Sequence, residues 1–206
     1  MPRTATHGIA MTDASPPTHP DVLEFLLTRR SRPAKMLRAP GPSRAELDRL
    51  LTAAARVPDH GKLEPWRFLV LERAALDRLT DLCAERGADL GEAPEKVEKA
   101  AATFRDSPFA VAVVSSPKPS EKIPEIEQVL SAGAVCLSLV NAALAQGFGA
   151  CWLSGYAAHD RAFCDRGLSL APHERIAGFI HIGRAEITPP DRPRPDVAAL
   201  TTWLEG

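Results

Sequence analysis

The chain has 206 residues, of which 45% are hydrophobic and 25% are charged, and its formal net charge is −1. This length supports one domain with a core of its own. A charge so close to zero excludes a global field that would recruit nucleic acid or an acidic membrane surface, so any basic binding site must be local.

The four cysteines form no C-x-x-C pair and show no zinc-ligand spacing. We therefore expect reduced, buried thiols in a cytoplasmic protein, and no metal site. The first 20 residues are rich in Thr, Pro and Ala and lack the apolar stretch of a secretory signal. We expect residues 1–20 to form a disordered N-terminal arm and residues 21–206 to form a single domain.

Two helices are predicted in the first quarter of this domain. Asp21 is a candidate N-cap for a helix that carries Val22, Phe25 and Leu26 on one face and ends at two arginines. The second helix begins with a capping box, in which Ser43 precedes Glu46 by three residues. It then places apolar residues at helical spacing over 47–54.

The middle of the chain alternates strands and helices. Residues 66–71 (WRFLVL) predict a strand, and residues 74–86 predict an amphipathic helix that ends at Gly87. A more charged helix is predicted over 95–104. The run 109–115 is apolar without interruption, which is typical of a strand buried on both faces.

The longest predicted element is a helix over 125–146 that Gly147 ends. Its apolar stretch is long enough to span a bilayer. However, it is rich in Ala, Val and Gly and contains polar residues such as Ser131 and Asn141, so we interpret it as a buried core helix.

The last third predicts shorter elements: strands over 149–153 and 176–183, a helix over 160–166, and a final helical turn or two around 197–204. More helix than strand, with no repeats, predicts an α+β or α/β fold in which helices cover a small sheet.

Arg29, Arg30 and Ser31 stand where the first helix ends. Two guanidinium groups beside a hydroxyl match a phosphate group, but cations at a helix C-terminus also suit the helix dipole without any ligand. Taken alone, the motif favours a solvated helix end. Three further basic residues in the same segment favour the phosphate site: Arg32, Lys35 and Arg38.

The segment 56–66 combines a turn with a histidine and a Pro-Trp pair. Pro58, Asp59 and Gly61 are explained by the turn alone. His60 by itself is an ordinary loop residue, and the tryptophan that opens the next strand is compatible with core packing.

The order of these features resembles the FMN-dependent nitroreductase family, and within it the compact branch of NAD(P)H nitroreductases. The resemblance covers most of the chain from about residue 21 onward. It rests on LLTRRS (26–31), AARVPDH (54–60), EPWRF (64–68), SAGAV (131–135), LAQGFGACWLSG (144–155) and IAGFIHIG (176–183).

The resemblance implies a small mixed or antiparallel central sheet flanked by helices, in an intertwined homodimer that holds FMN at the subunit interface. It implies that Arg29, Arg30 and Ser31 hold the FMN phosphate and ribityl chain from one subunit. Arg56 and His60 would reach the flavin from the other subunit.

The strand after the long helix is expected to line the flavin through Trp152, Leu153 and Ser154. The end of that helix matches the region offered to the nicotinamide nucleotide, namely Ala142, Ala143, Leu144, Ala145, Gln146 and Gly147. The chain has no C-terminal Lys-x-Arg phosphate clamp. Arg184, Arg192 and Arg194 are therefore left without an assigned role.

The expected activity is transfer of hydride from NAD(P)H through the flavin to an electron-poor small molecule such as a nitroaromatic or a quinone. Hydride passes directly between the nicotinamide and the flavin, so no catalytic side chain is assigned. We expect a second copy of the chain as partner, and neither nucleic acid nor membrane.

Two alternatives remain open. The chain could bind or sequester flavin without efficient NAD(P)H turnover, or it could be a cofactor-free dimeric scaffold. Oxidation of NAD(P)H tests the first alternative. A melting temperature that FMN leaves unchanged would indicate the second, because a ligand of the native state must stabilise it.

Overall fold

The computed structural model describes residues 17–204, and a four-stranded antiparallel sheet lies at its centre. The strands are β1 (Trp66–Leu71), β2 (Ala110–Ser115), β3 (Gly149–Leu153) and β4 (Arg175–Gly183), in the order β1-β2-β4-β3. The interior strand β2 is buried along all six residues, as its uninterrupted apolar run predicts. The predicted α+β fold class is confirmed.

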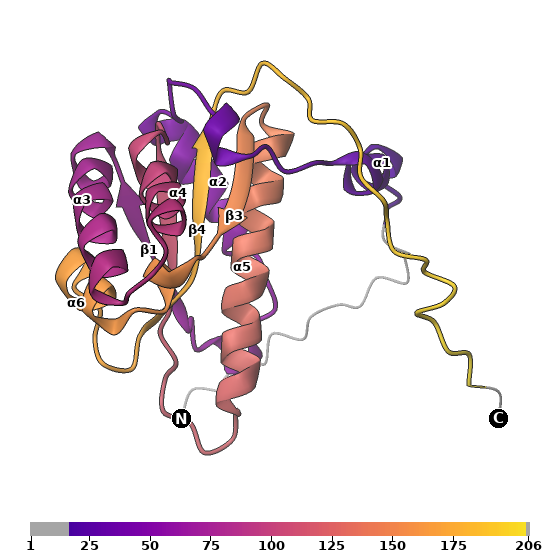
Figure 1. Cartoon of the computed structure of the whole chain (residues 1–206). Helices are drawn as coiled ribbons and strands as arrows, with labels where there is room; N and C mark the ends of the chain where they lie inside the picture. The colour runs from indigo at the N-terminus through magenta and orange to yellow at the C-terminus, as the bar shows by residue number, and fades with distance from the viewer. Residues whose placement is uncertain (1–16, 205–206) are drawn as a thin grey trace.

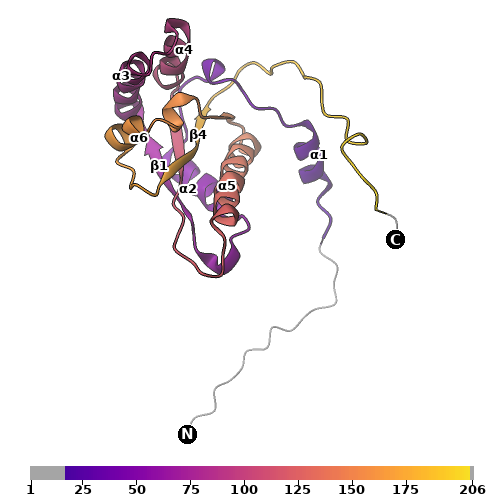
Figure 2. The same cartoon turned by 60° about the horizontal axis from the view of Figure 1, so that its bottom comes forward.

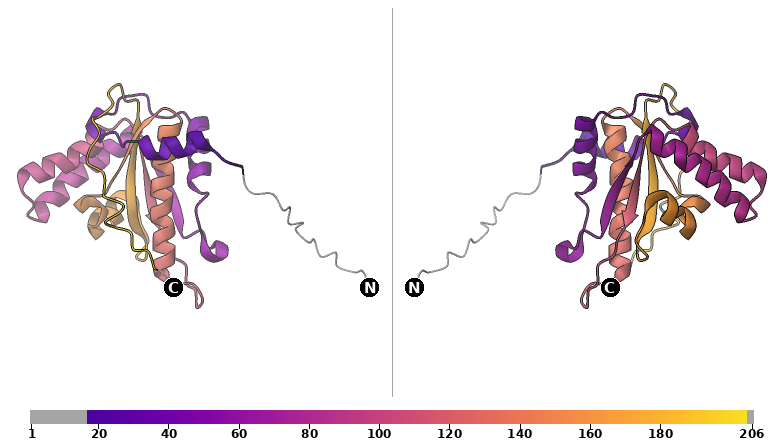
Figure 3. Two further views of the ribbon diagram at one scale, coloured as in Figure 1. Left: turned by 90° about the vertical axis from the view of Figure 1, so that its right-hand side faces the viewer. Right: turned by 90° about the vertical axis from the view of Figure 1, so that its left-hand side faces the viewer.

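Helices cover both faces of the sheet, which gives the three layers visible in Figure 3. On one face lie α3 (Arg73–Asp89), α4 (Pro94–Arg105) and α6 (Arg161–Leu168). On the other lie α2 (Arg44–Ala54) and α5 (Glu125–Ala145). Short 3-10 turns are η1 (Ala34–Met36), η2 (His60–Lys62) and η3 (Tyr156–Ala158).

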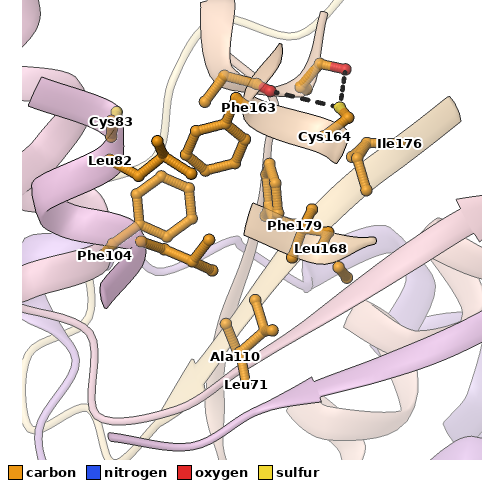
Figure 4. Packing of buried hydrophobic residues seen from close by; sticks show 14 of the residues in the cluster. Leu71, Leu82, Cys83, Phe104, Ala110, Phe163, Cys164, Leu168, Ile176 and Phe179 are labelled. Carbon is orange, nitrogen blue, oxygen red and sulfur yellow. Dashed lines mark hydrogen bonds between the residues drawn. The ribbon is translucent and has the colours of Figure 1, made fainter. Parts of the chain in front are cut away.

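Each face of the sheet has its own apolar cluster, because successive strand residues point to opposite faces. Under α3, α4 and α6, Phe104 packs edge-on against Phe179, with ring centroids 5.1 Å apart, and Phe163 joins them (Figure 4). Under α2 and α5, Ile180 and Ile182 of β4 are fully buried.

Helix α5 is long and apolar enough to cross a membrane by length and composition. In the fold, eight of its residues are buried, and it packs against α2, β2, β3 and β4. The expected core helix is thus observed, although one side exposes Ile126, Val129, Leu130 and Leu137.

The terminal segments lie apart from these layers. Helix α1 (Pro20–Thr28) has no buried residue, and the chain after β4 runs beside it, away from the body (Figures 1 and 2). The predicted domain from residue 21 therefore consists of a layered body and two outlying segments. The predicted arm at 1–20 falls mostly outside the described residues.

The predicted helical turn around 197–204 is present as one turn over 197–200, in which the Leu200 amide donates to the Asp196 carbonyl. Two predicted boundaries are wrong. Helix α1 begins at Pro20, so Asp21 lies in its first turn and His19 is the N-cap. Gly87 lies inside α3, where a Cβ would come within 2.5 Å of the Tyr156 hydroxyl. The helix ends at Asp89, and Gly91, with a φ of +67°, follows its C-cap Leu90.

Other local predictions are confirmed. The capping box of Ser43 and Glu46 begins α2, and both reciprocal hydrogen bonds are formed. Gly147, with a φ of +84°, follows the end of α5. All four cysteines are free and buried: Cys83, Cys136, Cys151 and Cys164.

Candidate functional site

The basic segment after α1 runs along the outer edge of the sheet. Strand β3 is an edge strand, so one side of its backbone is free of strand partners. The Arg32 amide donates to the Ala150 carbonyl on that side, at 2.8 Å. This bond places Arg29, Arg30 and Ser31 beside the end of β3.

A cavity of about 880 Å³ opens at this edge. Its walls are residues 29–35 without Arg32, one stripe of α4, residues 151–153 of β3, and part of the chain after β4. The sequence-predicted residues that line it are Arg29, Arg30, Ser31, Trp152 and Leu153.

Arg29 has a buried side-chain donor that could bind an anion. Its Nη2 donates to the Ser31 Oγ at 3.0 Å, whereas its buried Nε has no hydrogen-bond partner among the described residues. Burial lowers the pKa of Arg29, and the positive charges of Arg194 and Arg30 lower it further. A buried donor without an acceptor, among like charges, is a position that a phosphate would stabilise.

The chain after β4 completes the basic wall. Arg30 donates to the Pro190 carbonyl and to Asp191 Oδ1, the latter at 2.8 Å. Arg194 reaches the same carboxylate at 3.0 Å, and Arg192 also lines the cavity. Sequence reasoning left both arginines unassigned. The available signal was the Arg192-Pro193-Arg194 pattern, two cations held close by a proline.

The wall formed by β3 depends on a glycine in β4. The Trp152 indole lies over Gly178, where an added Cβ would stand 2.0 Å from the indole Nε1. That Nε1 donates to the Ala177 carbonyl at 3.1 Å. Ala177 is the extra residue of a β-bulge, because Val113 pairs with Gly178 and Val114 with Ile176. These contacts fix the indole while the Trp152 residue stays 42% exposed.

Cys151 also lines the cavity but stays inert as a nucleophile. It is 5% exposed, and burial raises the pKa of its thiol to about 12. A protonated thiol is a weak nucleophile. No histidine lines the cavity within residues 17–204, and Asp106 is its one acidic residue in that range. Within residues 17–204, the lining therefore offers cations for binding an anion but no side-chain pair for acid–base catalysis.

Arg56 and His60 lie away from this cavity. Arg56 follows α2 and is exposed, and His60 Nδ1 is 2.6 Å from Glu127 Oε2 on α5. Asp59 turns the other way and accepts hydrogen bonds from the Leu63 and Glu64 amides. Within one chain the two predicted groups of flavin-binding residues are separate, as expected if they serve different subunits.

The remaining predicted residues also lie outside the cavity lining. Ser154 is exposed just after β3. Ala143 is fully buried in the core, so its side chain is inaccessible to a nucleotide. The others at the end of α5 are partly or fully exposed, namely Ala142, Leu144, Ala145, Gln146 and Gly147.

Comparison with known proteins identifies the family. The model of the nitroreductase family matches residues 26–184. An Escherichia coli K12 protein named "Putative NAD(P)H nitroreductase YdjA" is 33% identical over 168 residues, covering 81% of this chain and 90% of its own. A Haemophilus influenzae protein named "Putative NAD(P)H nitroreductase" is 44% identical over 138 residues, covering 66% and 73%.

Solved structures share the fold. A nitroreductase-like family protein from Bacillus cereus superposes with a TM-score of 0.74 at 22% identity, over 96% of this chain and 100% of that one. A nitroreductase with bound FMN from Bacteroides fragilis gives 0.68 at 18% identity, over 90% and 99%.

The chain therefore belongs to the nitroreductase family. The predicted class, an oxidoreductase of a family that uses FMN as cofactor and NAD(P)H as co-substrate, is confirmed at this level.

Proposed function

We propose that this chain transfers hydride from NAD(P)H through bound FMN to an electron-poor small molecule such as a nitroaromatic or a quinone. The observation that carries the proposal is the buried, unpartnered Nε of Arg29 in a cavity lined by further cations. A phosphate satisfies that donor, and family membership supplies the identity of the molecule that bears it.

Each wall of the cavity has a role in this proposal. Arg29, Ser31 and Arg194 hold the phosphate, and Arg30 joins them from its ion pair with Asp191. Trp152, Leu153 and the exposed Ser154, at the end of β3, would line the flavin ring.

Bound FMN supplies the redox chemistry, so the protein needs no proton-transferring side chain. The residues around the cavity fix the position of the ring, exclude water from one side of it, and provide positive charge. Within residues 17–204, the cavity lining contains no histidine and no pair of carboxylates, which is compatible with a protein that leaves the redox step to its cofactor.

We also propose a homodimer in which the second subunit completes the site. Helix α1 exposes Val22, Leu23, Leu26 and Leu27, and α5 exposes a second apolar strip on the body. Apolar surface of this extent is typical of an interface. In such a dimer Arg56 and His60 of one subunit approach the flavin held by the other, and residues 142–147, apart from the buried Ala143, contact the nicotinamide nucleotide. We place this soluble assembly in the cytoplasm.

The first experiment is a visible spectrum of the freshly purified protein, before and after anaerobic addition of NADH and then NADPH. We expect a flavin band that bleaches with one or both nucleotides. A band that persists indicates a flavin-binding protein without turnover. No band after incubation with FMN would contradict the proposal.

A double substitution tests the phosphate site. Arg29→Ala with Arg30→Ala should release FMN, because each charge-assisted contact contributes roughly 1.5–3 kcal/mol. Arg44→Ala with Arg49→Ala is the matched control, because neither residue lines the cavity. Stoichiometric FMN in the Arg29 and Arg30 variant would contradict the site.

A further inference from the structure

The cavity carries more positive charge than one phosphate uses. Six basic side chains line it: Arg29, Arg30, Lys35, Lys99, Arg192 and Arg194. Asp191 offsets part of the charge of Arg30 and Arg194, and Asp106 is paired with Arg105. A phosphate monoester brings about −1.5 to −2 at pH 7. Positive charge is therefore left over for a second anionic group.

Lys99 differs from the other basic residues on its helix. Lys96 pairs with Glu92 at 2.6 Å, and Arg105 pairs with Glu98 at 2.8 Å. Within residues 17–204, the Lys99 ammonium has no hydrogen-bond or ion-pair partner. It points instead into the cavity, on a stripe with Ala102, Thr103 and Asp106 at helical spacing.

A second unpaired lysine lies on the facing element. Helix α4 packs against η1, which carries Lys35, and both lysine side chains line the same cavity. No described residue pairs with the Lys35 ammonium. Both lysines are exposed, whereas Cys151 at the sheet edge is buried, so the pair lies toward the mouth.

We propose that Lys99, together with Lys35, forms a second anion subsite that binds the diphosphate of the nicotinamide dinucleotide. This inference rests on the proposed function. A nicotinamide stacked on a flavin beside β3 leaves the rest of the dinucleotide to run outward across the mouth of the cavity. An ammonium on a flexible stem suits a diphosphate that passes there, since it acts as a mobile point charge.

The experiment compares Lys99→Gln with Lys96→Gln, both as FMN-loaded full-length protein. The control removes the same charge from the same helix, one turn away, at a residue outside the cavity lining. The dissociation constant of NADP⁺, which donates no hydride, is measured by calorimetric titration. Steady-state constants for NADPH are measured with a neutral quinone.

We expect Lys99→Gln to weaken NADP⁺ binding by roughly fivefold and to raise the KM for NADPH similarly, as for an exposed charge contact of about 1 kcal/mol. The kcat and the FMN content should stay unchanged. NADP⁺ binding should also become less sensitive to salt than in Lys96→Gln, because one ionic contact is lost.

Three outcomes would overturn the inference. Equal NADP⁺ affinity in the two variants excludes the subsite. Loss of FMN from Lys99→Gln assigns the lysine to the cofactor. A raised KM for a carboxylated nitroaromatic, with NADP⁺ binding intact, assigns it to the acceptor. A wild-type protein that oxidises no NAD(P)H contradicts the proposed function itself, and is distinguished from these results.

Discussion

The layered body and the two terminal segments contain similar apolar residues but cover them differently. In the body, leucines at helical spacing such as Leu76 and Leu79 are fully buried. In α1, leucines at the same spacing, such as Leu23 and Leu27, are 59% and 63% exposed. The chain after β4 likewise exposes Trp203 to 84%. One sequence pattern thus has two outcomes.

The difference shows which parts of one chain bury their own apolar side chains and which parts leave them exposed. The body buries most of its apolar side chains in two clusters on the faces of the sheet, apart from the strip exposed on α5. The terminal segments bury little in one chain, yet they carry four of the six basic residues that line the cavity, namely Arg29, Arg30, Arg192 and Arg194. The proposed site therefore lies at the border between the layered body and terminal segments whose apolar side chains stay exposed in one chain.

The largest effect is expected in the body. Phe104→Ala should lower the free energy of unfolding by about 3–5 kcal/mol, because it opens a cavity among Phe163, Phe179 and Leu82. Denaturant unfolding at a protein concentration that keeps the assembly constant measures this change. A loss below 1 kcal/mol would mean that this cluster does not hold the body together.

The next largest effect concerns the terminal segment. Leu27→Asp should weaken self-association, by roughly 1.5–3 kcal/mol for the lost burial of one leucine and more for burying the charge. Sedimentation across a dilution series measures it, with Glu24→Gln on the same helix as control. An unchanged dimer would show that α1 is not part of the interface.

A smaller effect concerns how the stability of the body depends on pH. Burial lowers the pKa of His181 from 6.5 to about 4, and its Nδ1 is 2.9 Å from Ser107 Oγ. Between pH 6.5 and pH 4, His181 is protonated in the unfolded state but stays neutral in the folded state. The free energy of unfolding therefore falls as the pH drops from 7 toward 4. We expect a loss of about 2 kcal/mol between pH 7 and pH 5 from this group.

Chemical denaturation over this pH range checks the expectation. His181→Gln should flatten the pH dependence, whatever its effect on absolute stability. If this variant keeps the slope of the wild type, another group causes the acid sensitivity.

Several features could be predicted from the sequence because they depend on neighbours in the chain. The capping box at Ser43 and Glu46 and the all-buried strand β2 follow from local patterns. The same holds for Gly147 after α5. The Arg29-Arg30-Ser31 motif could be found in the same way, since its residue types are adjacent. Family resemblance, rather than periodicity, gave them a flavin phosphate as ligand.

Other features depended on contacts between distant segments. Gly87 has the residue type of a helix end, but it lies within α3. The position needs a glycine because Tyr156 and Val97 approach too closely for a side chain. Arg192 and Arg194 became part of the cavity only because Asp191 and Arg30 tie the two terminal segments together. Lys99 resembles any surface lysine until α4 packs against η1.

The sequence by itself thus determined the fold class, most of the helices and strands, and the basic corner beside β3. Only the tertiary structure decided which cations share a cavity, which glycine is a packing requirement, and which leucines stay exposed. The physical reason is that helical and strand periodicity are set by neighbouring residues, whereas burial and charge balance sum over segments that folding alone brings together.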